Sequence, residues 1–168
     1  MKISVLRLGH RIFRDQRITS HCALVSRAFG ASEMTYTGEK DENTEKSVKD
    51  ISERWGGNFK IQHSDSHNKI IKNWKGKICH LTMYGINIDD FKIPEEDILV
   101  IVGGEKVPGE IYENADYNIA VGNQPHSEIA ALAIFLDRIN KGKEFKKDFK
   151  DSKVKIIPQE KGKKVINP

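Results

Sequence analysis

The sequence lacks most of the features that mark disulfide-bonded, metal-rich or membrane-spanning proteins. Its 168 residues include only two cysteines, Cys22 and Cys79, which are too few for a disulfide framework or a zinc cluster. No apolar run approaches the roughly 20 residues of a membrane-spanning helix. Arg7 interrupts the first apolar stretch, so we expect no secretory signal. These absences predict a soluble, cytoplasmic protein that has neither a metal nor a membrane as partner.

Several common nucleotide-binding and catalytic motifs are also absent. The sequence has no G-x-G-x-x-G after a predicted strand, no G-x-x-x-x-G-K-[ST] and no G-x-S-x-G. His63 and His67 are four residues apart, a spacing that suits two metal ligands on one helix face, but no HExxH and no third ligand accompany them. The sequence therefore gives no support for a dinucleotide fingerprint, a P-loop, a nucleophile elbow or a metal site.

Positive charge is concentrated at the two ends of the chain. Residues 1–30 contain six basic residues and one acidic residue, and residues 141–168 contain ten lysines and four acidic residues. The segment between them is net negative. Five of the seven arginines lie in the first thirty residues, and arginine binds phosphate through two parallel hydrogen bonds. This distribution indicates a partner with a phosphate backbone, although surface lysines also serve solubility alone.

Short apolar segments alternate with helical patterns along the whole chain. We expect strands at 3–8, 34–37, 59–62, 77–83, 97–102 and 116–121, and helices at 42–55, 68–74 and 127–139. A further helix is expected to start at Thr19 or Ser20 and to end at Phe29, before Gly30. This alternation favours an α/β fold, with a mainly parallel sheet and helices on both faces, in a single domain over residues 1–168. The Lys-rich extension, residues 141–168, has two short apolar stretches that indicate a β-hairpin.

Three loops that follow predicted strands are candidates for a binding site: 82–85, 103–109 and 122–127. Ligands of open parallel sheets bind beyond the carboxyl ends of the strands. Gly103, Gly104, Gly109 and Gly122 allow the backbone to approach a flat ligand closely. Such loops suit a nucleoside held by main-chain hydrogen bonds, although glycine after a strand is also ordinary turn chemistry.

Six segments carry a resemblance to a known family. They are LRLGHR, RDQRITSH, SRAFGA, HLTMYG, VGGEKVP and AVGNQPHSE, at residues 6–11, 14–21, 26–31, 80–85, 102–108 and 120–128. On these motifs the chain resembles the archaeal tRNA cytidine-56 2′-O-methyltransferases of the SPOUT superfamily. The resemblance runs in order from residue 3 to about residue 140. Residues 42–75 match only in pattern, and the Lys-rich extension carries no matching motif.

The resemblance implies a fold, a cofactor and two partners. The fold is a sheet whose C-terminal part forms a deep trefoil knot, the cofactor is S-adenosylmethionine, and the partners are tRNA and a second copy of the chain in a homodimer. Relatives tend to carry alanine where this chain has Gly104. Carried over by position, the cofactor-binding residues are Leu81, Gly103, Gly104, Glu105, Lys106, Val107, Val121, Gly122, Asn123, Gln124, Pro125, His126, Ser127 and Glu128.

The resemblance also assigns roles to the N-terminal arginines. Arg27 takes the place of the arginine near the reacting ribose hydroxyl, with His21 six residues before it as a second catalytic residue. Read from the residues alone, Arg27 also suits a cation that stabilises the end of a helix. Arg7, Arg11, Arg14 and Arg17 are expected to bind the RNA backbone.

The reaction implied is methyl transfer from S-adenosylmethionine to the ribose 2′-oxygen of cytidine 56 of tRNA. Two alternatives remain open at this point. One is a SPOUT methyltransferase that acts on a different RNA position. The other is a tRNA-binding module of the same fold that has lost catalysis.

Overall fold

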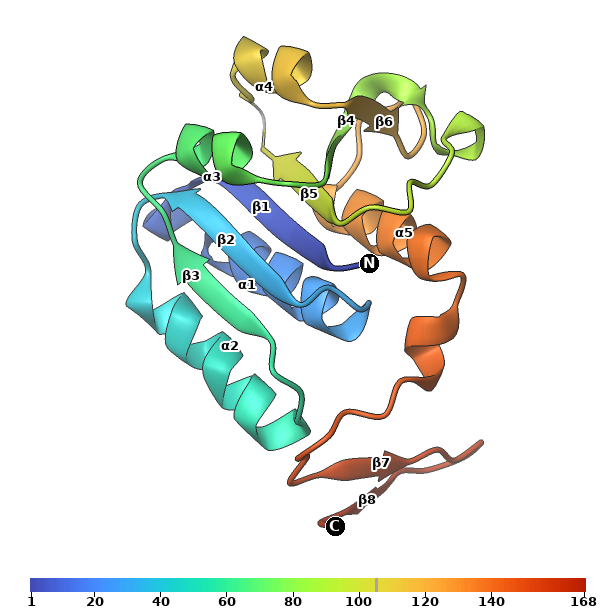
Figure 1. Ribbon diagram of the computed structural model, residues 1–168. Helices are drawn as coiled ribbons and strands as arrows, with labels where there is room; N and C mark the ends of the chain where they lie inside the picture. The colour runs from blue at the N-terminus through green and yellow to red at the C-terminus, as the bar shows by residue number, and fades with distance from the viewer. Residues whose placement is uncertain (105) are drawn as a thin grey trace.

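The computed structural model describes residues 1–104 and 106–168 (Figure 1). Strands and helices alternate as far as residue 140, and a small hairpin follows. The elements in chain order are β1 (Ile3–His10), α1 (Ile12–Ala28), β2 (Glu33–Gly38), α2 (Glu42–Trp55), β3 (Lys60–His63), α3 (His67–Asn73), β4 (Lys77–Asn87), η1 (Ile88–Asp90), β5 (Ile98–Gly103), α4 (Gly109–Asn114), β6 (Tyr117–Ala120), α5 (Glu128–Asn140), η2 (Lys143–Lys146), β7 (Lys155–Ile157) and β8 (Lys164–Ile166).

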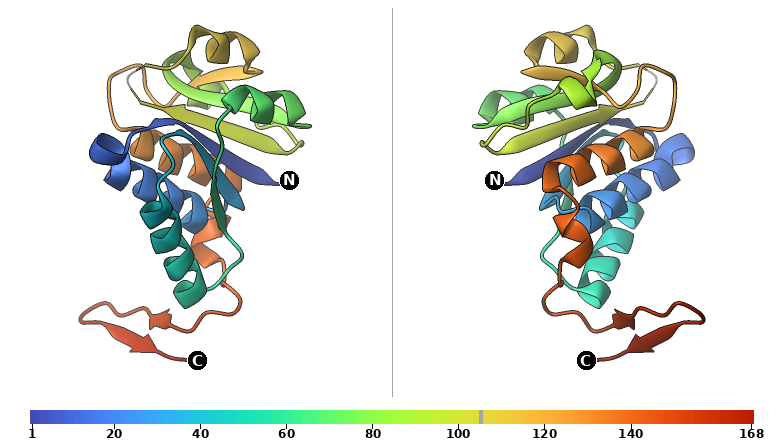
Figure 2. Two further views of the ribbon diagram at one scale, coloured as in Figure 1. Left: turned by 90° about the vertical axis from the view of Figure 1, so that its left-hand side faces the viewer. Right: turned by 90° about the vertical axis from the view of Figure 1, so that its right-hand side faces the viewer.

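Six strands form one sheet in the order β3-β2-β1-β5-β4-β6, and every neighbouring pair is parallel. Helices α1, α2 and α5 cover one face, and α3 and α4 cover the other (Figure 2). The central strands β1 and β5 are buried on both faces, which is why their sequences are nearly continuous apolar runs. The predicted mainly parallel sheet with helices on both faces is confirmed.

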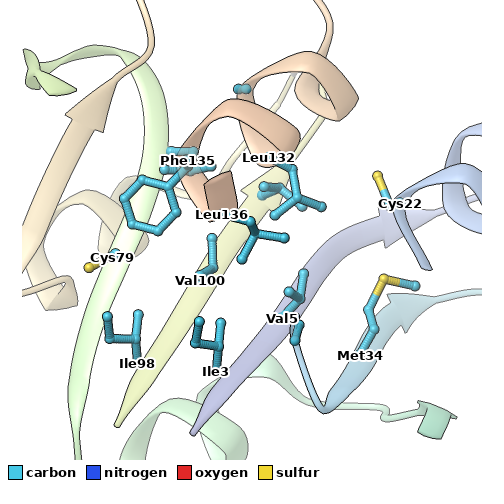
Figure 3. Packing of buried hydrophobic residues seen from close by; sticks show 14 of the residues in the cluster. Ile3, Val5, Cys22, Met34, Cys79, Ile98, Val100, Leu132, Phe135 and Leu136 are labelled. Carbon is cyan, nitrogen blue, oxygen red and sulfur yellow. The ribbon is translucent and has the colours of Figure 1, made fainter. Parts of the chain in front are cut away.

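Two apolar cores result from the alternation of side chains along the strands. Ile3 and Val5 of β1 point to one face, where they pack with Phe135 of α5 (Figure 3). Leu6 points to the opposite face and packs with Ile111 of α4. Successive strand residues point to opposite sides of a sheet, so one apolar strand serves both cores.

Helix α1 begins at Ile12, which is earlier than the predicted start at Thr19 or Ser20. The prediction of the start was wrong because the buried face of the first turns is polar: Asp15 and Thr19 lie on it, one turn apart. Asp15 replaces an N-cap side chain, since its Oδ2 accepts a hydrogen bond from the backbone N–H of Arg11 at 3.1 Å. A carboxylate at this position also interacts favourably with the positive, N-terminal end of the helix dipole. The helix ends close to the predicted place, with Gly30 at a φ of +94°.

Strand β4 is longer than predicted and meets β6 twice. Both Leu81 and Ile86 are aligned with Ile119, so residues 82–85 loop out of the ladder between two stretches of pairing. Gly85 makes this second approach possible, because a Cβ there would lie only 2.4 Å from the carbonyl carbon of Asn118. The looped-out segment is one of the three candidate loops.

The chain after α5 runs along the body and then leaves it. Gly142 and η2 follow α5, and Phe145 of η2 packs edge-on against Phe29 with ring centroids 5.7 Å apart. Strands β7 and β8 pair antiparallel and project from the rest of the molecule (Figures 1 and 2). No helix within the described residues is long and apolar enough to cross a membrane.

Candidate active site

A cavity of about 520 Å³ lies at the carboxyl ends of β1, β4, β5 and β6. The three candidate loops meet there, together with the first turns of α1 and α5. Its wall contains Arg7, Arg14, Asp15, Ile18, His80, Leu81, Thr82, Met83, Tyr84, Gly103, Gly104, Val107, Tyr112, Val121, Gln124, Pro125, His126, Ser127, Glu128 and Ala131. The parallel topology explains the position, because strands that run in the same direction end at the same edge of the sheet.

Most of the residues expected to bind a cofactor line this cavity. They are Leu81, Gly103, Gly104, Val107, Val121, Gln124, Pro125, His126, Ser127 and Glu128. Lys106, Gly122 and Asn123 belong to the same loops but do not line it. Glu105 lies outside the described residues.

Asn123 joins two of the loops instead of facing the cavity. Its Nδ2 donates hydrogen bonds to the carbonyl oxygens of Met83, at 2.7 Å, and Gly85, at 3.2 Å. Ser127 ends the same loop by capping α5, where its Oγ accepts a hydrogen bond from the N–H of Ile129. The loop is therefore anchored both to the looped-out segment of β4 and to the start of a buried helix.

Arg7 does not take the surface position expected of a residue that binds the RNA backbone. It continues the face of Ile3 and Val5, so its side chain is buried beneath α1 and the first turn of α5, and the residue is 1% exposed. Its Nη2 lies 3.2 Å from Oε1 of Glu128 and 3.9 Å from Oδ1 of Asp15. The expectation overlooked the strand alternation, which directs position 7 inward.

The buried pair of Arg7 and Glu128 keeps unused polar atoms. Nη1 of Arg7 and Oε2 of Glu128 are buried and have no hydrogen-bond partner among the described residues. Unpartnered buried polar groups cost about 1–3 kcal/mol each, so such groups beside a cavity suit a polar ligand. Arg7 is a cation and Glu128 is an anion. Together they match a ligand that carries one charge of each sign, as the ammonium and carboxylate of an amino acid do.

Arg27 and His21 are not brought to this cavity. His21 is exposed on α1. Arg27 is 8% exposed, donates from Nη2 to the carbonyl oxygen of Gly56 at 2.5 Å, and places its guanidinium 4.5 Å from the ring centroid of Phe149. Burial lowers the pKa of Arg27. A helix rises about 1.5 Å per residue, so Arg27 lies about 20 Å along α1 from Arg14, which does line the cavity.

Three further arginines lie at or near the start of α1, and Arg14 is the one of them that lines the cavity. The Arg14 side chain is 51% exposed, with its Nε 3.7 Å from Oδ1 of Asp15. The Arg11 side chain is 56% exposed, with its Nε 3.6 Å from Oδ2 of Asp15. Arg17 is exposed one turn further along α1. These three side chains remain accessible to a large ligand at this edge of the sheet.

His80 is a cavity residue that the sequence reasoning did not single out, although it begins one of the matching motifs. It is buried on β4, and its Nδ1 lies 2.8 Å from Oδ1 of Asn118. The Nδ2 of Asn118 donates to the carbonyl oxygen of Tyr112, which fixes the amide orientation. Burial lowers the pKa of His80. A histidine at the carboxyl end of an otherwise apolar strand was the available signal.

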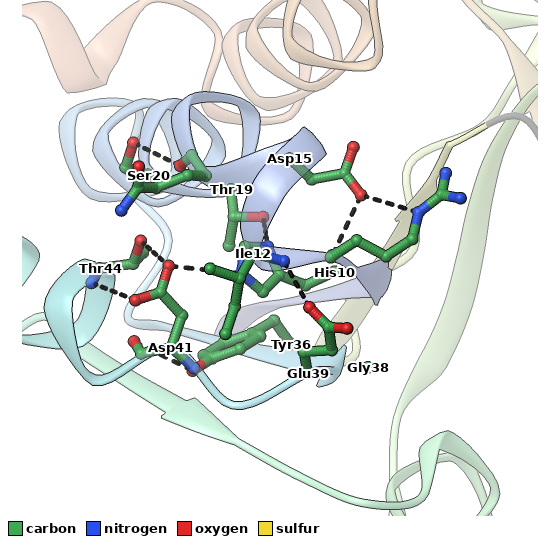
Figure 4. A network of polar contacts seen from close by, with 12 residues as sticks. His10, Ile12, Asp15, Thr19, Ser20, Tyr36, Gly38, Glu39, Asp41 and Thr44 are labelled. Atoms are coloured by element: carbon green, nitrogen blue, oxygen red, sulfur yellow. Dashed lines mark hydrogen bonds and ion pairs between the residues drawn. The ribbon is translucent and has the colours of Figure 1, made fainter.

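A buried polar network fixes the start of α1 against α2 (Figure 4). His10 Nδ1 lies 2.7 Å from Oγ1 of Thr19, and its Nε2 lies 3.4 Å from Oδ2 of Asp41. Asp41 also caps α2 by accepting hydrogen bonds from Thr44. Burial lowers the pKa of His10, and the nearby Arg7 adds to that effect. The network sets the direction in which α1 leaves β1 and thereby the place of Arg11 and Arg14.

Residues 55–166 match a family described as "tRNA ribose 2′-O-methyltransferase, aTrm56". A Thermococcus kodakarensis protein named tRNA (cytidine(56)-2′-O)-methyltransferase is 56% identical to this chain over 98% of the chain and 96% of that protein. A Pyrococcus horikoshii protein of the same name is 53% identical over 98% and 84%.

The fold is similar to that of the SpoU methyltransferase AviRb from Streptomyces viridochromogenes, solved in complex with AdoMet. The TM-score is 0.65 at 15% sequence identity, over 84% of this chain and 58% of that one.

Proposed function

This chain belongs to the tRNA ribose 2′-O-methyltransferase family, and from that membership we propose that it methylates the ribose 2′-oxygen of cytidine 56 in tRNA, with S-adenosylmethionine as the methyl donor. The observation that carries the proposal is the cavity in which the three strand-end loops meet. Its lining combines apolar side chains with backbone groups of glycine-rich loops, and such walls suit a nucleoside.

The residues present fit the proposed cofactor. Leu81, Val107 and Val121 give the cavity apolar walls, and the unpartnered atoms of Arg7 and Glu128 match the carboxylate and ammonium of an amino acid group. When bound, the cofactor supplies an electrophilic methyl group on a positively charged sulfur. The chain itself has to hold it, exclude water from the reacting atoms and align the ribose hydroxyl, and alignment alone is worth several powers of ten in rate.

Arg14 is the arginine that we place beside the reacting hydroxyl. It lines the cavity of its own chain, whereas Arg27 lies about 20 Å away along α1. A guanidinium stays protonated, so its role is to favour the developing negative charge on the oxygen or to orient an adjacent phosphate, and not to remove the proton. The resemblance places Arg27, with His21, beside the hydroxyl; within one chain the two lie away from this cavity, so in that role they would have to come from the second copy of the proposed homodimer.

The proposed tRNA-binding surface consists of Arg11, Arg14 and Arg17 together with the Lys-rich extension. Arg11 and Arg17 stand beside Arg14 on the exposed side of α1. The ten lysines of residues 141–168 add non-specific attraction to phosphate. A 2′-hydroxyl distinguishes RNA from DNA, and here it is also the nucleophile.

The proposal extends to the knot, the assembly and the location of the protein. The double approach of β4 to β6 around residues 82–85 supports a knotted C-terminal part of the sheet. Exposed apolar residues on α5 and on the projecting hairpin, including Ile134 and Ile156, support a homodimer. We place the enzyme in the cytoplasm because tRNA is its substrate, and we regard residues 1–168 as one domain with 141–168 as an extension.

The proposal is tested with labelled S-adenosylmethionine and two tRNA transcripts. One is unmodified, and the other carries 2′-deoxycytidine at position 56. Transfer to the first alone supports the reaction, the atom and the site together. Equal transfer to both shows a different position, and tRNA binding without transfer shows a binding module.

A comparison of Arg14→Ala with Arg27→Ala tests the choice of arginine. We expect Arg14→Ala to lose transfer while the Kd of the cofactor stays near the wild-type value. If Arg27→Ala shows the larger loss at unchanged cofactor affinity, the assignment to Arg14 is wrong.

A further inference from the structure

Arg27 is buried between the loop that follows α2 and the C-terminal extension. Its guanidinium lies 4.5 Å from the ring centroid of Phe149, and its Nη2 donates a hydrogen bond to the carbonyl oxygen of Gly56 at 2.5 Å. The residue is 8% exposed, and α1 ends at the next residue, Ala28. One side chain at the end of α1 therefore joins two segments that are far apart in sequence.

Residues 147–153, here called the strap, lie across the end of α2. The backbone N–H of Gly57 donates to the carbonyl oxygen of Lys150 at 2.8 Å, and the backbone N–H of Lys153 donates to the carbonyl oxygen of Arg54 at 2.9 Å. Backbone hydrogen bonds thus hold the strap to α2 and its following loop, while the Phe149 ring holds it to α1.

Two glycines after α2 allow the strap to lie this close. A Cβ at Gly56 would lie 2.4 Å from the carbonyl oxygen of Lys150, and a Cβ at Gly57 would lie 2.9 Å from Cδ1 of Phe149. Both glycines have a positive φ, +80° and +82°, which other residues rarely adopt. The loop is therefore shaped to receive the strap, and the contact is a fitted one.

The strap leads directly into the hairpin of β7 and β8, which projects from the body (Figures 1 and 2). Val154 joins the two and is buried, whereas the turn and the start of β8 are exposed. This exposed part contains Lys161, Lys163 and Lys164 and one acidic residue, Glu160. An exposed arm with excess positive charge suits a phosphate backbone. Its direction depends on where the strap is docked.

We propose that Arg27 is a positioning residue for tRNA: by holding Phe149 it docks the strap, and so fixes the hairpin as an arm that binds the tRNA backbone away from the cavity. The inference rests on the proposed function for the identity of the ligand. Arg27 lies about 20 Å along α1 from Arg14, which lines the cavity. The arm therefore contributes to tRNA binding and not to the alignment of the reacting atoms.

A docked arm and a catalytic arginine predict different effects on binding and turnover. Without the contact between Arg27 and Phe149 the arm has to be ordered when tRNA binds, which weakens binding. The loops at the cavity keep their contacts, so kcat at saturating tRNA is unchanged. If Arg27 acts instead beside the reacting hydroxyl in the cavity of a second copy, its loss lowers kcat at saturating tRNA.

The test compares Phe149→Ala, Arg27→Ala and the double variant. We expect each to raise the Kd for unmodified tRNA about tenfold, while kcat at saturating tRNA and the Kd for S-adenosylmethionine stay within about twofold. The double variant should bind tRNA no more weakly than the weaker single variant, because both changes remove the same contact. Arg27→Lys keeps a cation beside the ring and is expected to recover part of the affinity.

A second set of variants links the contact to the arm. Lys161→Gln/Lys163→Gln/Lys164→Gln removes three charges from the hairpin and leaves the strap intact. We expect it to raise the Kd for tRNA about tenfold in the wild-type background, and about threefold or less in Phe149→Ala. A smaller effect in the second background is the signature of an arm that needs its docking contact.

The matched control is Lys69→Gln/Lys72→Gln/Lys75→Gln. These three lysines are exposed on and just after α3, which covers the opposite face of the sheet from α1 and α2 (Figure 2). The variant removes the same total charge, and with it the same share of long-range attraction to a polyanion. We expect its Kd for tRNA to stay within about twofold of the wild-type value.

Four results would overturn the inference. They are a wild-type Kd for tRNA in Phe149→Ala, a lower kcat at saturating tRNA in Arg27→Ala, an equal effect of the hairpin variant in both backgrounds, and a change of oligomeric state in Phe149→Ala. The Kd for tRNA is measured without transfer. Wild-type protein that binds tRNA but transfers no methyl group therefore refutes the proposed reaction, while the Kd values still decide on the arm.

Discussion

Gly85 allows β4 to approach β6 a second time, and adding a single methyl group there is expected to disturb both the fold and the cavity. In Gly85→Ala the new Cβ would lie 2.4 Å from the carbonyl carbon of Asn118 and 2.4 Å from the backbone nitrogen of Ile119. Ordinary contacts of this kind are about 3.5–4 Å, so one of the two strands has to move by about 1 Å. Backbone atoms cannot rotate away as the end of a side chain does.

The expected loss of stability is about 2–3 kcal/mol, the upper part of the range for overpacked cores. For a chain of this size that corresponds to a fall in Tm of about 5–10 °C. The Kd for S-adenosylmethionine is expected to rise as well, because Asn123 donates a hydrogen bond to the carbonyl oxygen of Gly85 and so ties the loop that we propose binds the cofactor to this segment. Thermal unfolding with and without cofactor, and calorimetric titration, measure the two effects.

Gly104→Ala is the matched control for stability. It adds the same methyl group to another loop at the cavity, and nothing lies within 4 Å of the added Cβ. We expect its Tm to stay within about 1 °C of the wild-type value. If Gly85→Ala also keeps the wild-type Tm and cofactor affinity, the close approach of β4 and β6 does not constrain the chain and the reasoning is refuted.

Three further predictions concern charge, protonation and loop anchoring. The affinity for tRNA should fall steeply with salt concentration, and Arg17→Ala should reduce the slope of log K against log salt by about 0.7–0.9. Filter binding over 50–300 mM salt measures the slope, and an unchanged slope would show that Arg17 does not contact the RNA. The free energy of unfolding should fall as the pH drops below about 6.5. Burial holds the pKa of His10 and of His80 below 6.5, so the unfolded state takes up protons that the folded state does not. Urea unfolding at pH 7.5 and 5.5 tests this, and equal midpoints would contradict it. Asn123→Ala loses the two hydrogen bonds to residues 82–85 and should raise the Kd of the cofactor about tenfold. Titration calorimetry measures this Kd, and an unchanged value would show that these bonds do not hold the loop of Asn123 in place.

The alternation of apolar runs was enough to predict the parallel sheet, the helices on both faces and the loops that meet at the cavity. The start of α1 was not predictable from periodicity, because its first buried position is Asp15 and charged residues surround it. The buried carboxylate pairs with Arg7 of β1 as well as with Arg11 and Arg14 beside it in sequence, and the contact to β1 depends on tertiary packing.

The candidate site shows the same limit. Most of the loop residues named from the family motifs, Gly103 and Val121 among them, line the cavity, since a loop at a strand end keeps its place in the fold. The partners of Arg7 could not, since Glu128 is 121 residues away in sequence. Motif spacing also gave no distance between Arg14 and Arg27, because the two lie on one continuous helix whose early start the pattern did not reveal.

The position of β1 in the sheet has a consequence for how the protein is synthesised. β1 is the first strand made, yet it pairs on one side with β2 and on the other with β5, which starts at residue 98. At roughly 5–20 residues per second, a nascent chain waits about 5–20 s with one long apolar strand edge uncovered. Closure of the cavity comes later still, when Glu128 reaches Arg7. High contact order of this kind slows folding. We therefore expect the cavity proposed to bind the cofactor to form late. A ligand that binds there would stabilise the completed chain over its partly folded precursors.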